Sequence, residues 1–148
     1  MSPRTATARG AAIDPPPDPV PVSLWLQFFA VAGGPVAWSL QELINYPFAA
    51  LACFPNDEPL QVPTFAGERV LLFVVNLIAV VICALALASA IWILQRLRLS
   101  ARAGEEPLGP RLGRAHFFAV CGVMTGGAFM LGSLFDTVPL ILVPACSG

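Results

Sequence analysis

The sequence predicts an all-α integral membrane protein with three transmembrane helices in an N-in/C-out orientation. Hydrophobic residues make up 57% of the 148 positions and charged residues only 11%, whereas soluble domains average about 45–50% and about 25%. Three apolar stretches each exceed the roughly 20 residues that an α-helix needs to cross a bilayer core. The arginines are concentrated on one side of these stretches, which sets the expected orientation.

Residues 1–21 are predicted to form a disordered cytoplasmic tail. They combine small polar residues with closely spaced prolines, including Pro15, Pro16, Pro17, Pro19 and Pro21. Such a composition cannot bury an apolar core, and it favours extended polyproline-type conformations. The rest of the chain, residues 22–148, is expected to form one three-helix transmembrane domain.

The three predicted helices run from Leu24 to about Phe54, from Val70 to about Leu97, and from about Leu112 to Val143. The helices of a compact soluble bundle, which is the alternative, would carry polar residues at helical spacing. Residues 70–94 contain only Asn76 and Ser89 as polar residues apart from cysteine. The pattern therefore favours membrane-spanning helices.

A secretory signal peptide is a second alternative for the first apolar stretch, because residues 49–53 resemble a lipoprotein cleavage site. The stretch is about twice as long as a normal signal core. It also carries Gln41, Glu42, Asn45 and Pro47, where a signal core is uniformly apolar. We therefore expect a retained transmembrane helix.

The arginine distribution orients the helices. Seven arginines lie in the tail and in the segment between the second and third stretches: Arg4, Arg9, Arg96, Arg98, Arg102, Arg111 and Arg114. The opposite side has only Arg69. Cytoplasmic segments carry the excess of positive charge, which indicates a multi-pass protein with a cytoplasmic N-terminus. Trp38 is far from either interface and is expected to face a neighbouring helix.

Two of the four cysteines fall on the outer side in this orientation. Cys53 ends the first apolar stretch and Cys146 follows the third. Because the outer side is oxidising, we expect a disulfide that contributes about 2–5 kcal/mol. A copper-binding thiolate pair is the alternative, although it would need more histidine or methionine partners. Cys83 and Cys121 are expected to pack as small apolar side chains.

Five polar residues are predicted to form one intramembrane cluster in the outer half of the bilayer: Gln41, Glu42, Asn45, Asn76 and Asp136. Counted along each helix at about 1.5 Å per residue, they reach similar depths. A charge at the bilayer centre costs at least about 2.5–3.5 kcal/mol, so the two carboxylates are functional candidates. They could instead anchor helix ends near the outer headgroups, neutralised by protonation or by Arg69.

Small residues predict close helix packing. The first helix has Gly33 and Gly34 beside Pro35, which removes a backbone hydrogen bond and is expected to kink the helix. The third helix has Gly122 and Gly126 at GxxxG spacing, which lets helix backbones approach closely. Alanines at positions 84, 86, 88 and 90 extend this pattern to the second helix. Because three helices offer few internal faces, some of these residues are expected to meet other subunits.

Several classes of function are excluded by composition. A net charge of -1 leaves no basic face for nucleic acid. The single histidine, His116, cannot form a multi-histidine metal centre or a bis-histidine haem site, and it is expected at the cytoplasmic interface. No nucleophile elbow, phosphate loop or zinc-protease motif occurs. We expect no catalytic residue, metal or cofactor, and the expected partners are the lipid bilayer and other membrane subunits.

Two short strings carry a resemblance. Gly34-Pro35-Val36-Ala37-Trp38, followed by Tyr46 and Cys53, and the ending Pro139-Leu-Ile-Leu-Val-Pro144-Ala-Cys146 resemble small three-helix membrane proteins of unassigned role. Such proteins are often encoded beside haem-copper cytochrome c oxidase genes in proteobacteria. The resemblance implies association with an aerobic respiratory complex, and it carries over no catalytic residue.

The leading functional hypothesis is a non-catalytic inner-membrane protein, an accessory subunit or assembly partner of a haem-copper oxidase. A small oligomeric transport or ion-conducting component is the alternative, with Glu42 and Asp136 lining a polar path. A copper or haem delivery factor that uses Cys53 and Cys146 is a weaker one. Co-purification of partner chains would best distinguish the first two.

Overall fold

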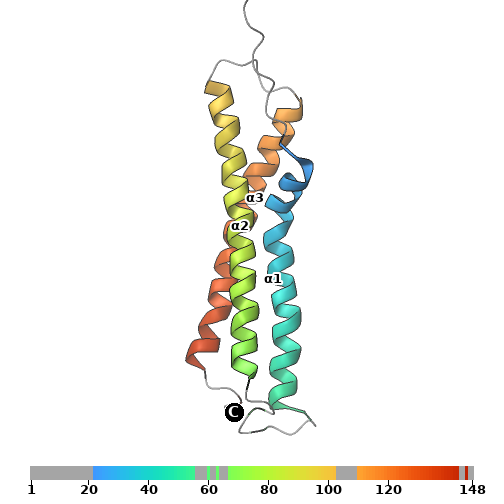
Figure 1. The fold of residues 1–148 in the computed structure, drawn as a ribbon, viewed down its shortest axis with the longest axis vertical. Helices are drawn as coiled ribbons and strands as arrows, with labels where there is room; N and C mark the ends of the chain where they lie inside the picture. Colours follow the sequence, from blue (N-terminus) through green and yellow to red (C-terminus); the bar gives the residue numbers. More distant parts are fainter. Residues whose placement is uncertain are drawn as a thin grey trace, which may run out of the picture.

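The structure is a computed structural model that describes residues 22–55, 60, 63, 67–102, 110–143 and 146. These residues form three α-helices and no β-strand: α1 (Leu24–Cys53), α2 (Glu68–Arg102) and α3 (Pro110–Leu142). Figure 1 shows the helices side by side, each antiparallel to the one before it. The all-α prediction is confirmed, whereas the predicted tail, residues 1–21, lies outside the described residues.

Two helices extend beyond the predicted apolar stretches, α2 at its C-terminal end and α3 at its N-terminal end. The α2 helix continues to Arg102 instead of ending near Leu97. Leucine and arginine are good helix formers, so the helix continues past the apolar segment. The α3 helix begins at Pro110, because proline is well tolerated in the first turn, where its missing N–H has no helical partner.

Large apolar side chains cover the outside of the bundle, while small and polar side chains fill its interior. Leucine, phenylalanine and valine side chains are exposed along all three helices. The largest fully buried side chains include Gln41, Asn76, Cys83 and Ser133. A helix bundle in water would bury its apolar stripe, so this inverted arrangement indicates an apolar environment around the bundle.

Two of the helices in the described part of the chain, α2 and α3, are long and apolar enough to cross a membrane. The α1 helix has 30 residues, which is also sufficient length. Its apolar character is reduced by Gln27, Gln41, Glu42 and Asn45. Membrane association of the protein therefore rests on α2 and α3.

Glycines bring the three helices into close contact. A Cβ atom on Gly122 would lie 2.7 Å from the backbone oxygen of Ala30 in α1 and 3.0 Å from Cβ of Ala90 in α2. A Cβ atom on Gly126 would lie 3.2 Å from Cα of Leu87. The GxxxG pair is thus used inside the chain.

Gly33 and Gly34 also face the other helices of the same chain, with prospective Cβ contacts to Ala86 and to the backbone of Gly126. These glycines therefore pack within the chain, and the expectation that some small residues meet other subunits stays a prediction. Gly127, in contrast, has open space around its prospective Cβ within the described part of the chain.

Pro35 leaves one carbonyl of α1 without its helical donor, and α3 compensates. A proline lacks the N–H that would bond to the carbonyl four residues earlier, which is that of Val31. The hydroxyl of Thr125 lies 3.3 Å from this carbonyl oxygen, and it also contacts the Cys121 carbonyl oxygen in its own helix at 2.9 Å. A polar contact between helices thus forms where the proline interrupts the α1 hydrogen bonds.

Candidate functional site

A buried hydrogen-bond network connects the three helices. Gln41 in α1 donates through Nε2 to Oδ1 of Asn76 in α2 at 2.8 Å and to Oδ2 of Asp136 in α3 at 3.4 Å. Gln41 is 1% exposed and Asn76 is fully buried. Asn76 in turn donates to the backbone oxygen of Leu72 at 2.9 Å. Three members of the predicted polar cluster therefore meet in the interior.

Trp38 also belongs to this network. Its indole Nε1 donates to Oδ2 of Asp136 at 2.9 Å, and its ring packs against Phe129 with a centroid distance of 5.5 Å. The side chain faces a neighbouring helix, as its position in the sequence suggested. No sequence pattern pointed to Asp136 as its partner.

Glu42 and Asn45, the other two members of the predicted cluster, lie farther toward the ends that carry Cys53 and Cys146. They line a cavity of about 340 Å³ between the three helices. Asp136 lines the same cavity, and its carboxyl group lies close enough to that of Glu42 to interact. The cavity therefore adjoins the buried hydrogen-bond network, with Asp136 shared between them. We refer to it below as the outer cavity.

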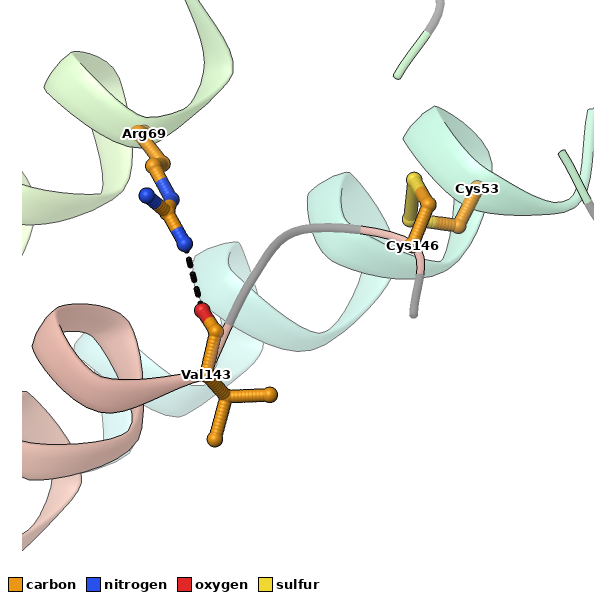
Figure 2. The surroundings of a disulfide bond; sticks show 4 residues. All are labelled: Cys53, Arg69, Val143 and Cys146. Carbon is orange, nitrogen blue, oxygen red and sulfur yellow. Dashed lines mark hydrogen bonds between the residues drawn. A yellow bond between two sulfur atoms is a disulfide. The ribbon is translucent and has the colours of Figure 1, made fainter. Parts of the chain in front are cut away.

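The outer cavity has an excess of acidic groups. Glu42, Glu68 and Asp136 line it together with a single basic residue, Arg69. The Arg69 guanidinium donates to the backbone oxygen of Val143, as Figure 2 shows. Arg69 therefore binds the end of α3 and forms no ion pair with Glu42 or Asp136, in contrast to the suggestion that it neutralises one of them.

Glu68 is the least expected member of the site. It lines the outer cavity and is only 4% exposed, and its Oε2 atom has no hydrogen-bond partner among the described residues. The same holds for the buried Oδ1 atom of Asn45. In the sequence, an acid that precedes a long apolar stretch is typical of a helix N-terminus, so its inward position could not be recognised there.

A disulfide between Cys53 and Cys146 lies beside the outer cavity. The two Cα atoms are 5.2 Å apart and the residues are separated by 93 positions. Figure 2 shows the bond joining the end of α1 to the chain that follows α3. It covalently closes the end of the bundle that contains the cavity.

The other two cysteines are free. Cys83 is fully buried, with its Sγ atom 3.7 Å from the carbonyl oxygen of Gly34 and 3.9 Å from Oγ of Ser133. Cys121 is partly buried. Both lie within helices, where they pack as small side chains.

The site has no arrangement suited to a metal ion. Among the described residues, no group of three or more histidine, cysteine, aspartate or glutamate side chains is close enough to hold one. The two sulfur atoms of a disulfide also offer no thiolate for copper. His116 is exposed near the start of α3, well away from the outer cavity in sequence and along the helix.

Comparisons with known protein families, with curated proteins and with solved structures give no match.

Proposed function

We propose that this chain is a three-span protein of the bacterial inner membrane and a non-catalytic accessory subunit or assembly partner of a haem-copper oxidase complex. The observation that carries the membrane part of the proposal is the exposure of large apolar side chains on all three helices. The link to an oxidase rests on the resemblance of the glycine-proline string in α1 and of the C-terminal segment.

The burial pattern of α1 supports a third span. Gln27 and Gln41 face the interior, whereas Leu43, Phe48 and Leu51 are exposed. The side chains of Gln27 and Gln41 are thus shielded from lipid, and the Nε2 group of each donates to partners within the chain. A helix of this kind crosses a bilayer as part of a bundle, although its composition alone is less apolar than that of its neighbours.

The charge distribution supports the N-in/C-out orientation. Arg96 and Arg98 lie near the end of α2, and the Arg96 guanidinium stacks over the Trp92 ring at 5.1 Å. Tryptophan and arginine are typical of the membrane interface. The disulfide lies at the opposite end of the bundle, which this orientation places on the oxidising side.

Quantitative mass spectrometry after native purification tests the proposed partnership. The tagged chain, expressed at its natural level, is purified in a mild detergent beside an unrelated tagged three-span protein. We expect the oxidase subunits to be enriched with the chain and not with the control. Equal recovery of oxidase subunits in both samples would contradict the proposed partnership.

A small oligomeric ion-conducting component is the second candidate, and the acidic outer cavity favours it. The cavity adjoins a buried polar network, as an ion pathway would require. Ion flux into proteoliposomes that contain the purified chain tests this candidate. Flux that is lost in Glu42→Gln would support conduction, whereas flux no greater than in empty liposomes would exclude it.

A further inference from the structure

We infer that the outer cavity is a binding site for a small organic amine, with its ammonium group beside Glu68 and its carbon chain along the apolar wall. The inference concerns the isolated chain and does not depend on the identity of the partner complex. It rests on the charge, the unpartnered acceptors, the shape and the apolar part of the cavity lining.

The lining has more acidic groups than basic ones, and two of its buried acceptor atoms have no partner among the described residues. Glu42, Glu68 and Asp136 present carboxyl oxygens, and Asn45 presents a buried amide oxygen that has no partner among the described residues. The guanidinium of Arg69, the one basic group, donates to the Val143 carbonyl. An ammonium group supplies three N–H donors and a positive charge, which is what these acceptors lack.

Glu68 distinguishes this site from a solvated acidic surface. A carboxylate at a helix N-terminus normally faces water or bonds to the backbone N–H groups of the first turn. The Glu68 side chain is only 4% exposed, and its Oε2 atom has no hydrogen-bond partner among the described residues. Because a buried acceptor without a donor is unfavourable, a ligand donor at this position would stabilise the site.

The distribution of the acids favours an elongated organic cation over a metal ion. Glu68 precedes Asn76, which bonds to Gln41, by eight residues in α2. The two residues therefore lie about 12 Å apart along the helix axis. No group of three or more histidine, cysteine, aspartate or glutamate side chains in the described chain is close enough to hold a metal ion. The Glu68 carboxyl group therefore lies toward one end of the cavity, apart from the neighbouring carboxyl groups of Glu42 and Asp136.

The remainder of the lining matches a hydrocarbon chain. Leu72, Pro139 and Leu140 contribute apolar side chains from α2 and α3. The volume of about 340 Å³ lies at the lower end of the about 300–1,000 Å³ typical of small-molecule sites. An amine of a few carbon atoms fits this combination of acidic and apolar walls.

Titration calorimetry with n-butylamine tests the inference. The full-length chain with its disulfide intact is placed in nanodiscs of zwitterionic lipid, and empty nanodiscs provide the background. 1-Butanol, which has the same carbon chain without the charge, is the matched control ligand. We expect saturable 1:1 binding of n-butylamine, and binding of 1-butanol weaker by at least about tenfold, as for loss of a charge-assisted hydrogen bond.

Variants locate the binding site. Glu68→Gln should weaken n-butylamine binding by about tenfold, and Asp136→Asn, which changes an acid at the other end of the cavity, should weaken it less. Glu106→Gln, which removes an acid from the segment between α2 and α3, should leave the affinity unchanged. Circular dichroism checks that each variant is folded, and Glu68→Gln provides the test if Asp136→Asn does not fold.

Three outcomes would overturn the inference. They are equal binding of 1-butanol and n-butylamine, no saturable signal above empty nanodiscs, and unchanged affinity in a folded Glu68→Gln variant. None of them bears on co-purification with an oxidase, so the two proposals fail independently.

Discussion

The indole of Trp38 in α1 donates a 2.9 Å hydrogen bond to the Asp136 carboxylate in α3, 98 positions later. The same carboxylate oxygen accepts a longer bond from Gln41 at 3.4 Å. An acidic side chain within an apolar helix is thus held by two N–H donors from one neighbouring helix. This contact links the hydrogen-bond network to the outer cavity, since Asp136 belongs to both.

Trp38→Phe should destabilise the bundle by about 1–2 kcal/mol, because it removes one of the donors to a carboxylate while keeping an aromatic ring against Phe129. Unfolding in mixed detergent micelles, followed by circular dichroism, measures the change. Trp25→Phe is the matched control, since Trp25 is 84% exposed. Equal stability of both variants would show that the Trp38 hydrogen bond contributes nothing to stability.

Helix positions and interior polar residues could be predicted from the sequence because both have strong local signals. An apolar run longer than a bilayer span predicts a helix, and a polar residue within it must find a partner. Gln41, Asn76 and Asp136 were identified on that basis. Which residues become their partners depends on how each helix is rotated about its axis. The sequence does not indicate this rotation, because apolar residues surround the whole helix and no single face is marked as the inner one.

The outer cavity could not be predicted for a related reason. Glu68 and Arg69 are adjacent in sequence, yet Glu68 is buried while Arg69 reaches the backbone of Val143. A shift of one position along a helix rotates a side chain by about 100°, so adjacent residues face different surroundings. Which of the two side chains is buried depends on the packing of α2 against α1 and α3.

The disulfide predicts the reactivity of the four cysteines. Alkylation after denaturation but without reduction should label Cys83 and Cys121, while Cys53 and Cys146 should be labelled only after reduction. Peptide mass mapping of the purified chain identifies the labelled positions. Reduction should also lower stability by about 2–5 kcal/mol. Labelling of Cys53 or Cys146 without prior reduction would show that the disulfide does not form in the cell.

The orientation predicts the behaviour of reporter fusions. A periplasmic reporter fused after Gly148 should be active, and the same reporter fused after Gly104 should be inactive, because the proposed orientation keeps the arginine-rich segment in the cytoplasm. Enzyme activity in intact cells, corrected for fusion protein level, measures this. The reverse pattern would contradict the N-in orientation and would place the disulfide end of the bundle on the reducing side.

Two glycines of α3, Gly122 and Gly127, give a matched pair of substitutions. Gly122→Ala should destabilise the bundle by about 1–3 kcal/mol, because the added methyl group meets the Ala30 backbone oxygen at 2.7 Å and neither backbone can move alone. Gly127→Ala has open space in the described structure and should leave stability unchanged or raise it by up to about 1 kcal/mol. Detergent unfolding of both variants tests the pair, and similar effects would contradict the packing of α3 against α1.

The two acids distinguish an accessory subunit from an ion pathway. Glu42→Gln and Asp136→Asn keep the side-chain shape, and an amide oxygen at position 136 can still accept hydrogen bonds from Trp38 and Gln41. As an accessory subunit, each variant should assemble with its complex and leave respiration nearly unchanged, as measured by oxygen consumption and by the amount of co-purified complex. Asp136→Leu is the contrasting variant, because it leaves the Trp38 N–H without its acceptor and Gln41 with only its bond to Asn76, so it should lower the amount of folded protein. Loss of respiration in Glu42→Gln or Asp136→Asn at a normal level of assembled protein would instead assign the acids a role in moving protons or ions.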